Sequence, residues 1–417
     1  MVRHQEGNYI FSLDVGSSFI RGVVGEILPN LPLQIIASVT KESQGIRKGQ
    51  IFDYESAVDS ITQAIEEISN TTGQKSPSFI VSISGPHIES ISSRGVVAVS
   101  RADGEITEDD VQRAIKAAQA FSLPKNKEII HIIPKEFIVD KERGIRDPIG
   151  MHGVRLEVEC EVILASSSYI NSFTKAIEES GGNISGMVFS TLAASEAVLS
   201  KRQKELGVLV LDVGGSSTGM CVFEEGNLLS AAVLPIGASH ITNDIAIAFQ
   251  VPIETAEKIK LKYGMACHQD GSEKRKEEIS LKEFDQESNK KISRKKLIDV
   301  IEARIQEILE LVNKELKRIG RERLLPGGVI LTGGGAKMPR MEEIVKKELH
   351  LPCQIGFPTK VEGIVDKIDD PGFASSIGLL LWELKEQEKE GGFGFGKKFK
   401  FAKNLSRFKK WLEELLP

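Results

Sequence analysis

The sequence is poor in cysteine, and its few cysteines lie far apart. Only four occur in 417 residues, and no two of them form a Cys-x-x-Cys pair. This spacing argues against both a disulfide framework and a zinc site. No apolar signal-like segment precedes the first predicted strand, so we expect a protein of the reducing cytosol.

Long hydrophobic runs and a strong net charge are also missing. No apolar stretch approaches the roughly 20 residues of a membrane-spanning helix, so any membrane contact is expected to be peripheral. The net charge of −5 gives no general signal for nucleic-acid binding. With 41% hydrophobic and 27% charged residues, the composition is that of a globular protein long enough for two or more cores.

Two Asp-Val-Gly turns, at residues 14–16 and 212–214, organise the sequence. An apolar run precedes each turn and another follows it, which predicts strand, turn and strand. A Rossmann fingerprint or a Walker loop would instead open a helix. Glycine and hydroxyl residues at a hairpin tip can approach phosphate oxygens closely, and a carboxylate at the strand end can hold Mg²⁺ through water. Two facing tips could therefore clamp one polyphosphate.

A third glycine turn occupies residues 333–335, directly after the apolar run 329–332. Pro339 stands ahead of an amphipathic stretch at 341–349 and suggests that a helix starts there. The glycines would let backbone lie flat against a planar base.

The three turns, in this order, resemble the phosphate-1, phosphate-2 and adenosine motifs of the actin, Hsp70 and sugar-kinase superfamily. The resemblance implies an α/β, actin-like ATPase fold with two similar halves around a nucleotide cleft. It implies ATP and Mg²⁺ as ligands, with Asp14 and Asp212 positioning the metal through water and Arg21 adding positive charge. The nucleotide-binding residues implied in the three turns are Asp14, Gly16, Ser17, Ser18, Arg21, Asp212, Gly214, Gly215, Ser216, Thr218, Gly334, Gly335 and Met338.

Glu257 and Lys260 add a fourth candidate element. They lie three residues apart in a predicted helix at 253–260 and so share one face. By themselves they are equally consistent with a solvated ion pair. The superfamily resemblance places this Glu-x-x-Lys at the ribose and adenine side of the nucleotide.

Residues 86–164 predict a small α+β insertion in the first half, with a helix that begins at a capping box on Thr107. The segments 131–137 and 148–157 resemble subdomain 1C of FtsA, a family of actin-like bacterial cell-division proteins. The resemblance covers essentially the whole folded region. It implies subdomain 1A at 1–85 with 165–203 and 358–385, 1C at 86–164, 2A at 204–237 with 324–357, and 2B at 238–323.

Lys296 and Arg304 lie on a long amphipathic helix predicted at 293–318. A charged helix face is usually just solvated. In the FtsA family, however, the matching positions meet the acidic C-terminal tail of FtsZ.

The C-terminal tail differs in charge from the rest of the chain. Residues 386–396 predict a flexible linker, and residues 397–417 carry +5 against −10 elsewhere. Apolar side chains recur there at helical spacing, which is typical of a helix lying in an anionic membrane interface. The alternative is a helix docked on its own domain. The predicted membrane contacts are Phe401, Leu405, Phe408, Trp411, Leu412 and Leu415.

Together these features predict an FtsA-like, ATP-binding protein that polymerises on the cytoplasmic membrane face at the division septum. The resemblance implies that it anchors FtsZ filaments and meets other division proteins through residues 86–164; no nucleic-acid partner is expected. Residues 190–194, Ser-Thr-Leu-Ala-Ala, stand where several actin-like relatives have a water-activating glutamate followed by proline. Without that carboxylate we expect slow turnover.

Two alternatives remain from the sequence. One is a pilus-assembly scaffold of the PilM type, which shares the fold and a comparable insertion. The other is an enzyme such as a sugar kinase, which requires a catalytic aspartate in the cleft. The basic amphipathic tail speaks against both.

Overall fold

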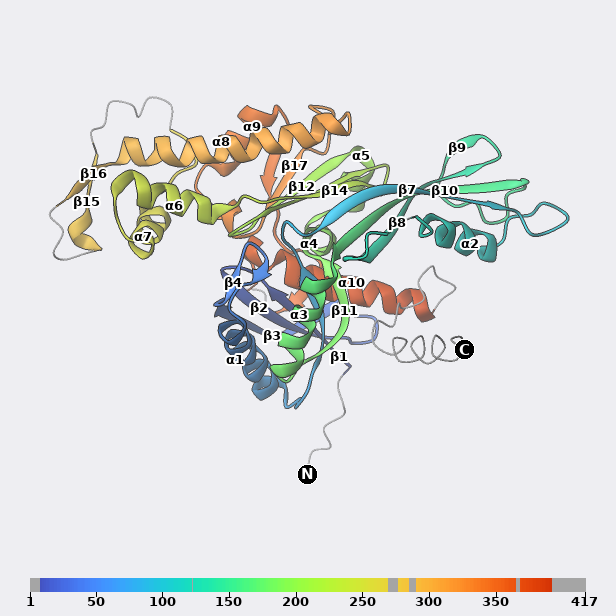
Figure 1. Cartoon of the computed structure of the whole chain (residues 1–417), viewed down its shortest axis with the longest axis horizontal. Coiled ribbons are helices and arrows are strands. Elements are labelled where there is room, and N and C mark those ends of the chain that lie inside the picture. The colour runs from blue at the N-terminus through green and yellow to red at the C-terminus, as the bar shows by residue number, and fades with distance from the viewer. Residues whose placement is uncertain (1–7, 122, 269–276, 285–289, 365–367, 392–417) are drawn as a thin grey trace.

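The computed structural model describes residues 8–391 except 122, 269–276, 285–289 and 365–367. Each of two halves is built on its own mixed sheet, and a third sheet extends from one side as an elongated insertion (Figure 1). The predicted membrane-contacting residues of the tail lie outside the described residues. Within the described part, no helix has the length and apolar character needed to cross a membrane.

The first half contains a six-stranded sheet in the order β11-β6-β1-β2-β3-β19. Strands β1 and β2 form the predicted hairpin, and β6 runs parallel to β1. Helices α1 and α3 pack on one face, and α10 packs on the other together with α4. The elements are β1 Tyr9–Val15, β2 Phe19–Glu26, β3 Leu33–Glu42, β4 Ile46–Arg47, β5 Gln50–Ile51, α1 Tyr54–Thr72, β6 Ser78–Ile83, α3 Ser167–Glu179, β11 Asn183–Phe189, α4 Ser190–Val198, β19 Val361–Gly363 and α10 Ala374–Gly391.

The second half repeats this pattern in a five-stranded sheet, β14-β13-β12-β17-β18. Strands β12 and β13 form the second hairpin, and β17 runs parallel to β12, as β6 does to β1. The prediction of two similar halves is therefore confirmed. The elements are α5 Lys201–Leu206, β12 Val208–Val213, β13 Thr218–Glu224, β14 Asn227–Leu234, α6 Ala238–Phe249, α7 Ile253–Tyr263, β15 Glu278–Ser280, β16 Lys291–Ser293, α8 Arg294–Arg318, β17 Val329–Thr332, α9 Met341–Leu349 and β18 Cys353–Ile355.

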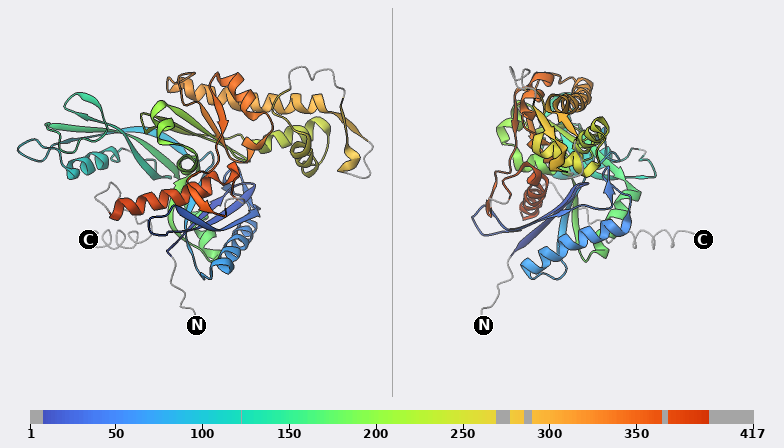
Figure 2. Two further views of the ribbon diagram at one scale, coloured as in Figure 1. Left: turned by 180° about the vertical axis from the view of Figure 1, so that it is seen from behind. Right: turned by 90° about the vertical axis from the view of Figure 1, so that its left-hand side faces the viewer.

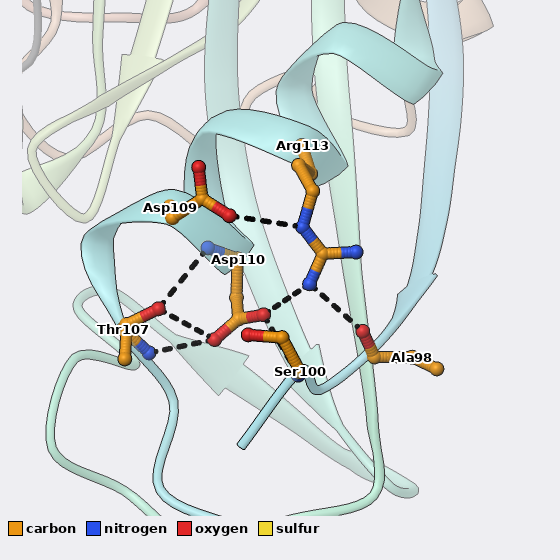
Figure 3. Close-up of polar contacts among 6 residues, drawn as sticks. All are labelled: Ala98, Ser100, Thr107, Asp109, Asp110 and Arg113. Atoms are coloured by element: carbon orange, nitrogen blue, oxygen red, sulfur yellow. Dashed lines mark hydrogen bonds and ion pairs between the residues drawn. The ribbon is translucent and has the colours of Figure 1, made fainter.

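The insertion is a four-stranded antiparallel sheet, β7-β10-β8-β9, with α2 against one face. Helix α2 begins at the predicted capping box: the side chain of Thr107 accepts from the backbone N–H of Asp110, and Asp110 accepts from that of Thr107 (Figure 3). Asp110 also accepts from the N–H of Ser100 at 3.0 Å and pairs with Arg113. One buried carboxylate thus joins α2 to the end of β7. The elements are β7 Glu89–Ala98, α2 Glu108–Ala118, β8 Lys127–Val139, β9 Glu142–Ile145 and β10 Arg155–Ser166.

Three sequence predictions differ from the structure. The residue pattern at 192–201 indicates one helix, but the structure has two, because α4 ends at Val198 and Ser200 caps α5. Helix α10 continues to Gly391, so the first six residues of the predicted linker at 386–396 are helical. Strands β11 and β14 were not predicted. The subdomain boundaries themselves stay a prediction.

Candidate functional site

The two hairpin tips meet between the halves. Ser17 Oγ and Ser216 Oγ lie 2.7 Å apart in a hydrogen bond. Each tip is closed in the same way: the N–H of Gly16 donates to the carbonyl of Phe19 at 3.0 Å, and that of Gly214 to Ser217 at 3.0 Å. The tips thus present equivalent glycine and hydroxyl groups to one space, as the sequence predicts.

A carboxylate stands at the end of the first strand in each hairpin. Ser82 of β6 donates to Asp14 at 2.5 Å. Burial raises the pKa of Asp14, against the opposing effects of Ser82 and Arg21. Burial, followed by the nearby charge of Asp14, raises the pKa of Asp212 to about 7, while Arg21 lowers it. Two adjacent carboxyls therefore resist being ionised together.

Arg21 stands directly opposite Asp14 in the β1–β2 register, so both side chains lie on one face of the hairpin. Its guanidinium packs on two rings, 5.1 Å from the centre of Phe19 and 5.4 Å from that of Phe373. The Nε atom is buried and has no hydrogen-bond partner. The side chain is therefore held beside the carboxylates, with donor capacity left for a ligand.

The third glycine turn packs against the end of β12. Gly333 adopts φ +79°, and a Cβ atom there would collide with the carboxylate of Asp212. A Cβ atom on Gly335 would collide with Val213, whereas one on Gly334 would meet nothing within 4 Å. Backbone at Gly334 is thus open to a flat ligand. Met338 packs half-buried against the core of the second half.

Glu257 and Lys260 belong to a partly buried network in which the ammonium group of Lys260 is shielded from solvent. Lys260 Nζ lies 2.6 Å from the Glu257 carboxylate and donates to Thr242 Oγ1 at 2.8 Å, and Thr242 donates to Glu257 at 2.5 Å. The side chain of Lys260 is 8% exposed and that of Glu257 42%. One carboxylate face therefore stays open to a ligand.

Helix α6 joins this network to the second hairpin tip. The N–H groups of Ala238 and Ser239 donate to the carbonyls of Gly214 and Gly215, at 2.9 and 2.7 Å. Lys260 Nζ also reaches the carbonyl of Ala238 at 3.4 Å. The Glu-x-x-Lys pair and the second tip are consequently held in one rigid arrangement.

Three of the predicted site residues, Thr218, Lys296 and Arg304, contact other groups of the protein itself. Thr218 is fully buried, and its hydroxyl donates to the carbonyl of Ile236 at 2.7 Å, which does not fit a phosphate contact. Lys296 and Arg304 lie on α8, where Arg304 makes a two-pronged ion pair with Asp244, at 2.6 and 2.9 Å. The ammonium of Lys296 lies over the ring of Phe249 at 5.8 Å.

Two hydroxyl residues near the site were missed from the sequence, Ser82 and Thr242. Ser82 interrupts an otherwise apolar buried strand, and a polar residue buried in that way needs a partner. That signal could have found it. Thr242 stands in a helix with nothing in the local sequence to distinguish it.

The donor set fits a magnesium polyphosphate. Two carboxylates suit Mg²⁺, because this ion usually keeps several of its waters and binds through one or two carboxylates together with substrate phosphates. A cation there would also favour the ionised form of both buried acids. Backbone N–H groups and hydroxyls of the tips suit phosphate oxygens.

Comparisons with known proteins place the chain in a family. A family model described as "Cell division protein FtsA" matches residues 209–378, and one described as "SHS2 domain inserted in FTSA" matches residues 85–164. Cell division protein FtsA of Pseudomonas aeruginosa is 34% identical over 418 residues, with 99% of each chain covered. The chain belongs to the FtsA family. FtsA of Borreliella burgdorferi is 38% identical over 381 residues, covering 91% of this chain and 92% of its own.

Solved structures confirm the actin-like fold. The PilM–PilN type IV pilus biogenesis complex superposes with a TM-score of 0.64 at 18% identity, covering 89% of this chain and 98% of its own. MreB5 of Spiroplasma citri bound to ADP gives 0.55 at 13% identity, covering 92% and 98%. At these identities the likeness shows the fold alone. The family assignment therefore rests on the FtsA relatives.

Proposed function

We propose that this FtsA-family protein binds ATP with Mg²⁺ between the two hairpin tips. The observation that carries the proposal is the Ser17–Ser216 contact at 2.7 Å, with one buried carboxylate behind each tip. In this arrangement the tips hold phosphate oxygens, and Asp14 and Asp212 hold the hydrated metal. Glu257 and Lys260 face the ribose side, and Gly334 lies against the base. Mg²⁺ neutralises phosphate charge when bound.

Turnover of the bound nucleotide is slow in this proposal. Ser190 and Thr191 occupy the stretch where several actin-like relatives carry a glutamate, and both are buried. The hydroxyl of Thr191 has no hydrogen-bond partner and lies where a side chain on Gly219 would point. A hydroxyl is a poor general base at neutral pH. Phosphate release at many turnovers per second by the purified protein would contradict this part.

The protein further polymerises on the cytoplasmic face of the membrane at the division septum and tethers FtsZ filaments there. Residues 397–417, with a charge of +5, serve as the membrane anchor. One such tail binds reversibly, whereas many tails on a polymer bind firmly through avidity. Lys296 and Arg304 on α8 receive the acidic FtsZ tail, and the insertion receives other division proteins.

Co-sedimentation with anionic vesicles tests this function. The intact chain and a chain ending at Gly396 are compared, each with and without ATP and Mg²⁺. We expect only the intact chain to sediment, and more of it with ATP, because the polymer multiplies weak attachments. If both forms stay in solution, the tail is a docking helix and the membrane function is wrong.

A further inference from the structure

Four lysines lie near Glu196 on the face formed by α4, α5 and α10, and two of them pair with its carboxylate. Glu196 lies 2.8 Å from the ammonium of Lys204 and 3.5 Å from that of Lys385. Lys360 donates to the backbone carbonyl of Glu196 at 2.6 Å. Lys201 adds a further positive charge close to Lys360. We call Lys201, Lys204, Lys360 and Lys385 the α4–α10 lysine cluster.

The cluster carries more positive charge than the protein neutralises. Glu196, which is only 14% exposed, is the one acidic group among the described residues that bonds to any of the four lysines. Glu205 lies next to Lys204 in sequence but is engaged by Arg146 of the insertion, at 2.9 and 3.1 Å. The Glu196 carboxylate therefore pairs with only two of the four lysines, and the ammonium groups of Lys201 and Lys360 contact no carboxylate among the described residues.

The surroundings of Lys360 disfavour its charged form, chiefly through burial. Burial, and then the positive charges of Lys204, Lys385 and Lys201, lower the pKa of Lys360, while Glu196 opposes them. An anion placed among these lysines would relieve the repulsion. Lys385 is 53% exposed and Lys360 and Lys201 are exposed, so their ammonium groups can be reached from solvent.

The cluster lies close along the chain to the predicted membrane anchor. Lys385 belongs to α10, which runs along the surface of the first half below the insertion and ends at Gly391 (Figures 1 and 2). Six residues of helix separate Lys385 from Gly391, about 9 Å at 1.5 Å per residue. Residues 391–397 span at most about 20 Å even when fully extended. An anchored tail therefore keeps the cluster within about 30 Å of the lipid surface.

We propose that the α4–α10 lysine cluster binds the phosphate headgroups of anionic phospholipids, as a second membrane contact beside the tail. The proposal rests on the proposed membrane attachment and adds a site to it. A membrane is favoured over a free phosphate because the charge is spread over three exposed lysines from separate elements, and because the tail holds this face near lipid. Bound in this way, α10 would fix how the two halves are oriented on the membrane.

The test neutralises the three exposed lysines and keeps the buried Lys204–Glu196 pair. The variant K201Q/K360Q/K385Q is compared with the full chain on vesicles of phosphatidylcholine with and without phosphatidylglycerol. We expect a loss of affinity for the anionic vesicles of roughly tenfold to a hundredfold, since each of the three lysines at such a surface contributes up to about fivefold. No change is expected on neutral vesicles. The variant K201R/K360R/K385R should bind like the parent.

A matched control removes three exposed lysines elsewhere, K258Q/K314Q/K346Q, on α7, α8 and α9. An equal loss in both triple variants would show that only net charge matters and would overturn the site. Full affinity in K201Q/K360Q/K385Q would overturn the site as well. If this variant sedimented less than the parent even without vesicles, the cluster would serve contacts between copies of the protein, and the lipid site would be wrong. Failure of the parent to bind any vesicle would instead refute the membrane function itself. Thermal melting of each variant reports whether it is folded.

Discussion

Ser17 and Ser216 are 199 positions apart in the sequence, yet their hydroxyl oxygens share a hydrogen bond of 2.7 Å. Each hydroxyl stands at the tip of an equivalent hairpin, one from each half. The N–H of Gly49 also donates to Ser17 at 3.2 Å, and Gly49 packs directly against Gly85 at the start of the insertion. The first hairpin tip is therefore connected through Gly49 both to the second tip and to the start of the insertion.

Removing one of these hydroxyls should weaken nucleotide binding more than it weakens the fold. We expect Ser216→Ala to lower the affinity for ATP and Mg²⁺ about fivefold to thirtyfold, because the hydrogen bond that this hydroxyl donates to a charged phosphate is lost. Isothermal titration calorimetry with a non-hydrolysable ATP analogue measures this. Ser76→Ala is the matched control, because that exposed hydroxyl bonds to Gly181 away from the cleft. Equal affinities in the two variants would contradict the predicted clamp.

The raised pKa of Asp212 should make the nucleotide-free protein lose stability as the pH rises. The carboxyl titrates near 7 in the folded chain and near 4 when unfolded, so its protonated form favours folding below about pH 4, and this contribution is lost as the pH climbs to about 7. Between pH 6 and 8 we expect Asp212→Asn to gain about 1 kcal/mol of unfolding free energy relative to the parent. Urea unfolding at both pH values measures it.

Asp103→Asn provides the comparison for this pH effect. Asp103 is exposed, and its pKa is lowered, chiefly by the backbone N–H of Glu105. Its contribution is therefore already complete above pH 4 and should not change between pH 6 and 8. A parallel pH response in the Asp212→Asn variant and the parent would show that the carboxyl is ionised throughout that range.

The open face of Glu257 should recognise the sugar and not the phosphates. We expect Glu257→Gln to weaken ATP binding about fivefold and to leave binding of inorganic tripolyphosphate unchanged. The reason is that only ATP has ribose hydroxyls that can donate hydrogen bonds to the carboxylate. Competition against a fluorescent ATP analogue measures both ligands. Glu254→Gln, one turn earlier on the same helix, is the control. An equal loss for ATP and tripolyphosphate would place Glu257 at the phosphates instead.

Much of the site follows from local sequence. Both hairpins were predictable because an apolar run, Asp-Val-Gly and a second apolar run leave few other structures possible. The third turn followed in the same way. The strands that were missed lack such a pattern: β11, Asn183–Phe189, contains Gly186, and the centre of β14, Asn227–Leu234, is Ser-Ala-Ala, which has little preference for strands. Their place in a sheet depends on strands far away in the chain, and the strand propensity of a segment gives no information about such partners.

Other features depend on tertiary contacts alone. Glu257 and Lys260 look like an ordinary surface pair until Thr242 and the carbonyl of Ala238 surround the ammonium group. Thr218 looks like a phosphate-binding hydroxyl, but Ile236 takes its hydrogen bond. In both cases the partner comes from a neighbouring element whose position no local pattern specifies. The direction of a side chain at a hairpin tip was therefore less predictable than the hairpin itself.

The ion pair between Arg304 and Asp244 bears on partner binding, because it occupies the guanidinium that is proposed to receive the FtsZ tail. Two hydrogen bonds, of 2.6 and 2.9 Å, join α8 to α6. An acidic peptide must compete with Asp244 for Arg304. We expect Asp244→Asn to raise the affinity for a peptide of the FtsZ C-terminal tail about threefold to tenfold, since an amide competes for the guanidinium less well than a carboxylate. Fluorescence anisotropy with the labelled peptide measures this.

Two further variants decide how this result is understood. Glu307→Gln removes the other carboxylate that contacts Arg304, one that is 52% exposed, and should raise affinity less, because an exposed pair is screened by solvent. Arg304→Gln combined with Asp244→Asn should abolish the gain, since the benefit of freeing Arg304 requires the guanidinium. Should the double variant keep the higher affinity, the gain would come from removing negative charge near the peptide, and Arg304 would serve only to join α8 to α6.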